Sequence, residues 1–155
     1  MDLKKSLLVL LAIALGALAF ASTNGEQVYQ KHCSSCHQPT GKGIAGAFPP
    51  LVEVVPEYLE KGDLGRKFLI HVVLYGIQGE ITAGGGTYNS MMPPYGNQLS
   101  DEEVAAVLNY IAKAWGNDKL LPKDFKDFTP EEVKAERGKK LTPVQVYEEW
   151  KKLVK

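Results

Sequence analysis

Cysteine and histidine are scarce in this chain of 155 residues, which contains two cysteines and three histidines. A structural zinc site normally takes four such ligands in paired clusters, and the chain has too few for that arrangement. Charge of one sign is lacking as well, because 18 basic residues balance 18 acidic ones. This balance excludes the broad basic surface that binds nucleic acid.

Apolar runs long enough to cross a bilayer are also lacking. The first residues contain basic Lys4 and Lys5, an apolar run from Leu7 to Leu18, and the small-x-small sequence Ala19-Phe20-Ala21. These are the three parts of a secretory signal peptide, so we expect residues 1–21 to direct export and to be cleaved after Ala21. The run is shorter than the roughly 20 residues that span a bilayer. We therefore expect a periplasmic protein, which would be membrane-associated if the segment were not cleaved.

The two cysteines stand close together in Cys33-Ser34-Ser35-Cys36-His37. Cys-x-x-Cys-His is the attachment pattern of a c-type haem. Its thiols form thioether bonds to the two vinyl groups of one porphyrin, and its histidine reaches the iron from one face. A redox-active cysteine pair or a structural disulfide is an alternative in an oxidising compartment, but neither accounts for His37. The motif predicts one haem c, bound covalently through Cys33 and Cys36.

Hydrophobic periodicity and capping residues predict a mainly α-helical protein. Ser100 with Glu103 forms a capping box for a helix that extends to about Trp115. Gly76 should end a nearly all-apolar, buried helix. The helices are expected at residues 25–31, 56–61, 66–75 and 100–115, with two more in the tail after Thr129-Pro130 and Thr142-Pro143.

The glycines in Ala83-Gly84-Gly85-Gly86 predict a tight turn between residues 77–82 and 87–90, and hence a short β-hairpin. The hairpin leads to Met91-Met92-Pro93-Pro94. Two neighbouring methionines would ordinarily be core filler, but the upstream haem motif makes either one a candidate iron ligand. Periodicity does not choose between them.

From Gly25 to about Trp115, these segments resemble a class I cytochrome c. The resemblance implies the fold of that family, with the hairpin before a methionine loop and a helical C-terminal extension. It also implies that the Pro49 carbonyl accepts a hydrogen bond from His37, and that His37 and Met92, rather than Met91, are the axial ligands. The matching parts are Gly25 and Tyr29, which would cross Val107 and Tyr110, the haem motif, Pro49-Pro50-Leu51 and Met92-Pro93.

The length and the tail narrow the resemblance to the longer bacterial cytochromes c that feed a haem-copper terminal oxidase. Residues 22–116 would form the cytochrome c domain, and residues 117–155 an extension packed on it. The resemblance implies a monomeric electron carrier, not an enzyme, that receives electrons from a respiratory complex and contacts membrane complexes peripherally. The alternatives are a haem enzyme or gas sensor with an open sixth position, and the cytochrome subunit of a dehydrogenase.

The surroundings of the haem can be expected from the same pattern. His71 lies within the apolar helix and is interpreted as a hydrogen-bonded core histidine, whereas His32 is expected to face solvent. Lys42 is the sole charge among the segments that would surround the haem edge, so we expect an apolar docking face. The residues expected around the ring are Phe48, Leu51, Leu69, Val73, Leu74, Ile77, Tyr88, Leu99, Leu108 and Ile111.

Overall fold

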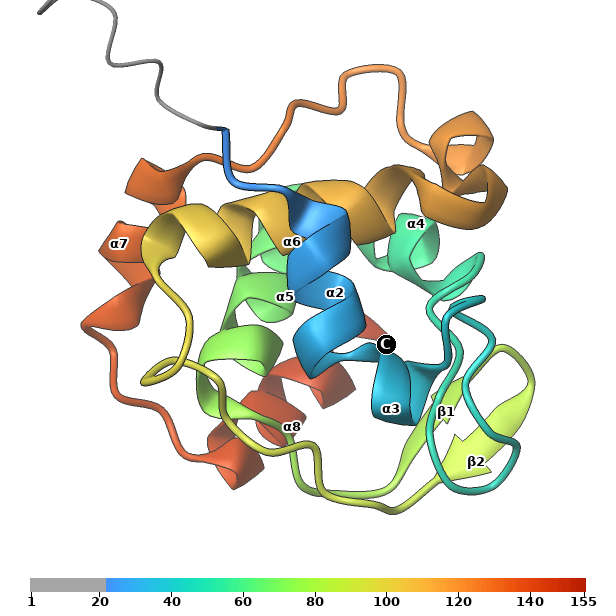
Figure 1. Ribbon diagram of the computed structural model, residues 1–155. Coiled ribbons are helices and arrows are strands. Elements are labelled where there is room, and N and C mark those ends of the chain that lie inside the picture. The colour runs from blue at the N-terminus through green and yellow to red at the C-terminus, as the bar shows by residue number, and fades with distance from the viewer. Residues whose placement is uncertain (1–21) are drawn as a thin grey trace, which may run out of the picture.

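A computed structural model describes residues 22–155 of the chain (Figure 1). The predicted signal peptide, residues 1–21, lies outside the described residues. Within the described part, none of the helices has the length and apolar character needed to span a bilayer. The elements, in chain order, are α2 (Gly25–His32), α3 (Ser34–His37), α4 (Val54–Leu59), α5 (Asp63–Tyr75), β1 (Ile81–Ala83), β2 (Gly86–Tyr88), α6 (Asp101–Lys113), the 3₁₀ helix η1 (Ala114–Leu120), α7 (Pro130–Arg137) and α8 (Pro143–Leu153).

Helices α2 and α6, the first and last of the expected cytochrome domain, cross, as the resemblance implied (Figure 1). Gly25 allows this crossing, because a Cβ atom there would collide with the backbone carbonyl of Ala106 on α6. Tyr29 is fully buried, and its ring lies against that of Tyr110 with the ring centroids 5.5 Å apart. Aromatic packing therefore holds α2 on α6 one turn away from the glycine contact.

Helix α5 forms the centre of the core, but it begins three residues earlier than predicted. Gly62, with φ 60° and ψ −132°, is the residue that separates α4 from α5, and α5 starts directly after it at Asp63. Phe68, Ile70 and Leu74 are almost completely buried. The helix ends at Gly76, whose φ of 73° is in the region that favours glycine. The predicted stop is thus confirmed.

The predicted hairpin is present, but its strands are shorter than expected. Strands β1 and β2 pair antiparallel, with Ile81 opposite Tyr88 and Ala83 opposite Gly86. Gly84 and Gly85 occupy the turn with φ values of 54° and 77°, as a two-residue turn with positive φ requires. Ile77 does not extend β1 but forms an isolated bridge with Met92.

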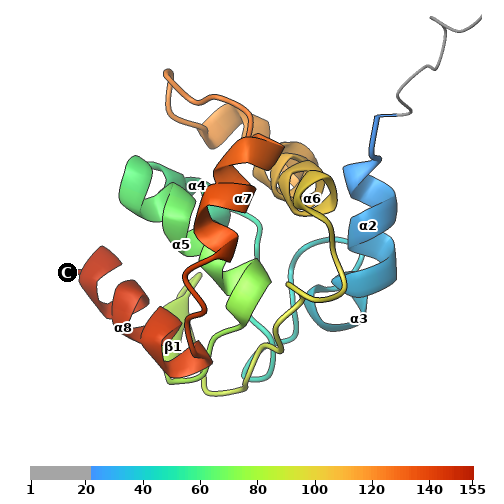
Figure 2. The ribbon, with the colours of Figure 1, turned by 90° about the vertical axis from the view of Figure 1, so that its left-hand side faces the viewer.

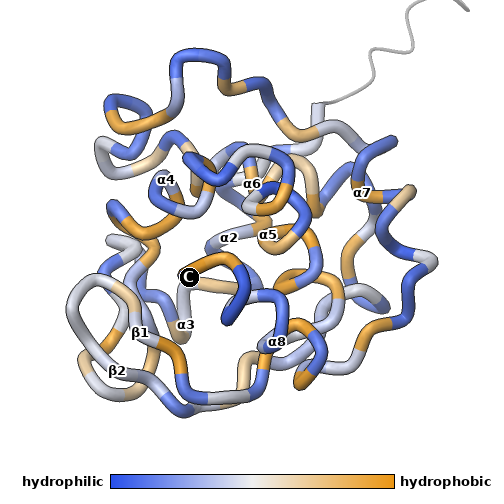
Figure 3. The backbone as a smooth tube through the Cα atoms, turned by 180° about the vertical axis from the view of Figure 1, so that it is seen from behind, coloured by the Kyte–Doolittle hydropathy of each residue, from blue (hydrophilic) through white to orange (hydrophobic). Residues whose placement is uncertain are grey.

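The tail forms the two helices that its capping residues predicted. Thr129 with Glu132 caps α7, and Thr142 with Gln145 caps α8. Both helices lie beside α5 (Figure 2). Both helices carry apolar and polar residues (Figure 3), and most of their large apolar side chains are buried against the core, although Val144 is 51 % exposed. The tail residues that join the main core are Phe128, Val133, Val146, Trp150 and Leu153.

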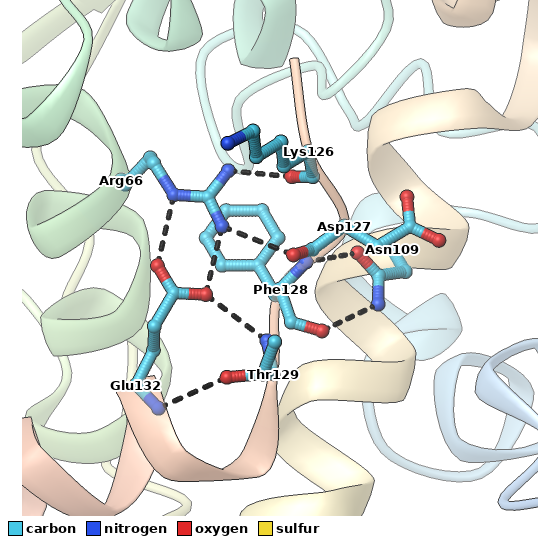
Figure 4. Close-up of polar contacts among 7 residues, drawn as sticks. All are labelled: Arg66, Asn109, Lys126, Asp127, Phe128, Thr129 and Glu132. Atoms are coloured by element: carbon cyan, nitrogen blue, oxygen red, sulfur yellow. Dashed lines mark hydrogen bonds and ion pairs between the residues drawn. The ribbon is translucent and has the colours of Figure 1, made fainter.

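Two polar groups on α5 also hold the tail. The guanidinium of Arg66 donates to both carboxylate oxygens of Glu132, at 3.0 and 2.8 Å, and to the carbonyls of Lys126 and Asp127 (Figure 4). His71 lies between two carboxylates, with Nδ1 2.7 Å from Glu149 and Nε2 2.6 Å from Glu136. The expectation of a hydrogen-bonded core histidine is confirmed.

Candidate functional site

The Cys-x-x-Cys-His motif forms the corner between α2 and α3. The backbone N–H of Cys33 ends α2 by donating to the Tyr29 carbonyl at 2.8 Å, and the N–H of His37 donates to the Cys33 carbonyl at 3.0 Å. This turn of helix brings Cys33, Cys36 and His37 to one cavity. The short spacing is thus sufficient to place all three side chains together.

His37 is held by Pro49. The residue is only 9 % exposed, and its Nδ1 lies 2.9 Å from the Pro49 carbonyl oxygen. A carbonyl only accepts hydrogen bonds, so Nδ1 carries the proton, and Nε2 is the nitrogen that can bind a metal ion. Burial lowers the pKa of His37, although the bond to Pro49 acts in the opposite direction. The imidazole is therefore neutral near pH 7, the form in which histidine binds metals.

The two cysteines are free and half-buried. Burial, with a smaller effect from Cys36, raises the pKa of Cys33 to about 11. Before any covalent attachment, Cys33 is therefore a neutral thiol at physiological pH. Since the two side chains do not form a disulfide, both are available for thioether bonds.

The neighbouring methionines differ in their environment. Met92 is half-buried against the core, whereas Met91 is 53 % exposed. The backbone of Met92 is fixed to that of Ile77 by two hydrogen bonds of 3.0 and 3.2 Å. Both side chains line the cavity. Of the two residues, Met92 is the one whose backbone is paired, and its partner Ile77 lies just after the end of α5.

The cavity that these residues share has a volume of about 1180 Å³, counted out to its open mouth. Its lining is largely apolar and comes from α4, α5, α6, the hairpin and the loop before α4. Eight of the ten residues expected around the ring line it, namely Phe48, Leu51, Leu69, Val73, Ile77, Tyr88, Leu108 and Ile111.

The other two expected lining residues, Leu74 and Leu99, pack in the core instead. His32 also differs from expectation, since it is half-buried, lines the cavity and stands edge-on to Tyr95. Sequence reasoning missed the contribution of α4, which adds Val54, Val55 and Tyr58 to the lining. The apolar pair Val54-Val55, directly before Pro56, is the sequence feature that could have indicated this contribution to the cavity.

Side chains from outside the cavity fix the loops that carry the motif and Pro49. The Tyr29 hydroxyl donates to the Gln38 carbonyl at 2.6 Å, next to His37. Trp115 donates to the Pro39 carbonyl at 3.0 Å. Asn117 is fully buried and bonded to the segment after Pro49. Sequence reasoning assigned no role to Asn117.

The residues present fit a c-type haem. Two free thiols stand one helical turn apart, a neutral imidazole offers Nε2, and a thioether side chain reaches the same cavity. The largely apolar lining suits the faces of a porphyrin. No part of this arrangement conflicts with covalent attachment through Cys33 and Cys36.

Comparisons with known proteins agree with this geometry. The family model described as "Cytochrome c" matches residues 22–115. The chain is 52 % identical over 151 residues to "Cytochrome c-552" of Thermus thermophilus, with 97 % of this chain and 98 % of that protein covered. A second cytochrome c-552 from Thermus thermophilus is 55 % identical over 130 residues, covering 84 % of this chain and 96 % of that protein.

A more distant relative is a cytochrome c subunit of a quinone-dependent alcohol dehydrogenase from Gluconacetobacter polyoxogenes. It is 34 % identical over 101 residues, but only 20 % of that subunit is covered. The relatives that match nearly end to end are the single cytochromes, so the alternatives of a dehydrogenase subunit and an open-site haem enzyme are not favoured. The chain belongs to the cytochrome c family, and it is an electron-transfer protein with one covalent haem c rather than an enzyme.

Proposed function

We propose that this protein is exported and carries electrons in a respiratory chain to a terminal oxidase, with His37 and Met92 as the axial ligands of its haem. One observation carries the ligand assignment. His37, oriented by Pro49, and Met92, anchored on Ile77, come from distant parts of the sequence and line the same cavity. A site closed by two protein ligands transfers electrons without an open position for a substrate.

Haem c supplies a one-electron couple when bound, and a methionine ligand together with a histidine raises its reduction potential. The protein residues act on that couple in two ways. The Pro49 carbonyl holds the ring of His37 in one orientation and one tautomer. The apolar lining disfavours the more positively charged oxidised state, which again raises the potential.

The proposed docking face surrounds the mouth of this cavity. Ile44 and Met91 are exposed apolar side chains, at 43 % and 53 %. Lys42 is the charged residue of these segments and is exposed. An oxidase with a matching apolar surface around its electron-entry site would fit this face, because few charges would need to lose water on contact.

The localisation and domain organisation complete the proposal. Residues 1–21 would serve as the export signal, and the mature protein would act as a periplasmic monomer that contacts membrane complexes peripherally. Residues 22–116 would be the cytochrome c domain and residues 117–155 an extension packed on it. The contacts that Arg66 and His71 make with carboxylates of the tail support the packing of this extension on the domain.

Replacement of the methionines tests the ligand assignment. In the haem-loaded protein, Met92→Ala should open one position of the iron. The ferric optical spectrum should change and the reduced protein should bind carbon monoxide. Met91→Ala is the matched control and should retain the wild-type spectrum, since that side chain is assigned to the surface. An unchanged Met92→Ala spectrum with no carbon monoxide binding would refute the assignment.

A redox titration followed by optical spectroscopy tests the role of the wild-type protein. We expect a single one-electron step and no carbon monoxide binding in the reduced state. Carbon monoxide binding by the wild-type protein would instead support a haem enzyme or gas sensor.

A further inference from the structure

Asn117 stands where the last helix of the cytochrome domain ends and the tail begins. Trp115 and Gly116, with φ values of 56° and 92°, turn the chain back at this point. The turn buries the Asn117 side chain completely. A buried amide side chain normally has a hydrogen-bonding role, because leaving its donors and acceptor unpaired is costly.

The amide of Asn117 bonds three backbone groups in two different segments. Its Nδ2 donates to the Ile111 carbonyl at 2.9 Å, which caps the last turn of α6. The same Nδ2 donates to the Leu51 carbonyl at 3.2 Å, and Oδ1 accepts from the Glu53 N–H at 2.8 Å. Asn117 thus fastens the segment 51–53 to the end of α6.

This segment directly follows Pro49, whose carbonyl accepts the hydrogen bond from His37. Pro50 has a fixed φ and no N–H to donate, so the chain from Pro49 to Leu51 is stiff. On the other side, Phe48 and Ile44 exchange two backbone hydrogen bonds of 2.8 Å. After Pro49, the N–H groups of Leu51 and Val52 also donate to the Gly41 carbonyl at 2.7 and 3.2 Å. The direction of the Pro49 carbonyl is therefore set by an anchor before it and by the segment 51–53 after it, which Gly41 and Asn117 hold together.

The anchored segment also includes a backbone conformation that needs support. Glu53 has a φ of 67°, which is uncommon for a residue with a side chain. Its N–H is the group that donates to Asn117. Without that bond, we expect Glu53 to relax toward a more ordinary conformation, which would leave the segment after Pro49 held by Gly41 alone.

From these contacts we infer that Asn117 is a positioning residue for His37, acting through the segment 51–53 and the carbonyl of Pro49. The inference rests on the proposed role of His37 as an axial ligand. Asn117 touches neither the cavity nor the ring. It contributes to how firmly the hydrogen bond between His37 and Pro49 is held.

The Nδ1 proton of His37 provides the test. In the haem-loaded ferric protein, the protons of an axial histidine have NMR resonances shifted far from the usual range, so their exchange with solvent can be followed individually. Asn117→Leu removes all three amide bonds, and we expect it to speed exchange of the His37 Nδ1 proton by about tenfold or more. If Asn117→Leu does not fold, Asn117→Ser takes its place in the experiment. The smaller side chain leaves room for water, so we expect a smaller acceleration of exchange than for Asn117→Leu.

Asn109, on the neighbouring helix α6, offers a matched control. Its side chain likewise forms hydrogen bonds with the backbone, since it accepts from the Phe128 N–H at 2.7 Å and donates to the Phe128 carbonyl at 2.9 Å (Figure 4). Asn109→Leu should lower the melting temperature but leave the His37 proton unaffected, because Phe128 lies in the tail. The proteins are compared at temperatures equally far below their own melting points.

The outcomes separate the inference from the proposed function. Equal acceleration in the Asn117 and Asn109 variants would indicate exchange through general destabilisation and would overturn the positioning role, as would no acceleration in the folded Asn117 variants. A wild-type protein in which His37 shows no shifted resonances would overturn the ligand assignment itself, and this inference with it.

Discussion

Arg66 uses its whole guanidinium group to hold the tail. Besides the bidentate contact with Glu132 and the two backbone carbonyls (Figure 4), the group lies over the Phe128 ring, 4.2 Å from the centroid. The Arg66 side chain is 16 % exposed and that of Glu132 is 38 % exposed. The pair is therefore only partly screened by water, and it should contribute more than an ordinary surface ion pair.

We expect Arg66→Ala to lower the free energy of unfolding by about 2–3 kcal/mol, because several hydrogen bonds and the cation–π contact are lost together. Arg66→Lys should recover little of this loss, since an ammonium group lacks the planar fork. Chemical denaturation of the haem-loaded variants measures both effects.

Lys67→Ala is a suitable control for this prediction. Lys67 contacts Asp63 at 3.3 Å, but the two side chains are 47 % and 84 % exposed. The substitution should change stability by less than about 0.5 kcal/mol. Similar losses for the Arg66 and Lys67 variants would contradict the role given to Arg66.

His71 illustrates what the sequence could and could not predict about individual residues. Its place in an apolar helix indicated a core histidine with hydrogen bonds, and this is confirmed. Its partners, Glu136 and Glu149, follow 65 and 78 residues later, and no local pattern connects such distant positions. The same reason hid Asn117, whose importance depends on backbone groups far away in the chain.

At the scale of the elements, α7 is held on α5 by a buried carboxylate. Glu136 is 8 % exposed, and its Oε2 lies 2.6 Å from His71 Nε2 and 2.7 Å from Lys139 Nζ. Burial raises the pKa of Glu136, but the hydrogen bonds and charges of Lys139 and His71 outweigh that effect. As a result, the pKa of Glu136 lies below its ordinary value of 4.5.

A lowered pKa in the folded state means that the ionised carboxylate stabilises the fold above its ordinary pKa, and that this contribution is lost as the pH falls. We expect Glu136→Gln to lower the free energy of unfolding by about 1–3 kcal/mol near pH 7. The difference from wild type should shrink steadily below the ordinary pKa of 4.5. Denaturation curves at a series of pH values measure this difference.

Glu131→Gln is the matched control, since Glu131 is on the same helix but exposed. Because its side chain is exposed, its replacement should have only a small effect on stability. A difference between Glu136→Gln and wild type that stays constant down to about pH 3 would contradict the linkage.

The element boundaries that the sequence missed have local physical causes. The helix expected from residue 66 in fact includes Gly65, where the Tyr58 carbonyl approaches so closely that a Cβ atom would have no room. Ile77 was expected in the hairpin but pairs with Met92 instead. In both cases a contact with another segment overrides the local preference, whereas the capped starts of α6, α7 and α8 were predictable from neighbouring residues alone.

At the scale of the whole molecule, basic and acidic residues nearly balance, so the protein has no strong electrostatic field. Residues 22–155 contain 16 basic and 17 acidic residues, and the basic excess is in the tail rather than around the cavity. The family, the haem and the order of parts could be predicted from the sequence, because they depend on short motifs. The shape of the docking face could not, because it depends on which side chains of those motifs are left exposed.

The weak field predicts how electron delivery responds to salt. Raising the ionic strength from about 10 mM to about 150 mM should change the rate of oxidation by the proposed partner, a terminal oxidase, by less than about threefold. Stopped-flow measurement of oxidation gives this rate, and Lys42→Ala should alter it little. A steep decline with salt would show that charges outside the proposed docking face steer the encounter.

The tail forms hydrogen bonds with the chain both before and after the loop that carries Met92. The N–H of Gln78 donates to the Pro143 carbonyl at 3.1 Å, and Arg137 donates to the carbonyls of Gly96 and Leu99. The loop therefore does not form an opening unit of its own. We therefore expect release of the tail and loosening of the loop to occur as one cooperative event, so that residues 117–155 would help to hold the proposed methionine ligand in place.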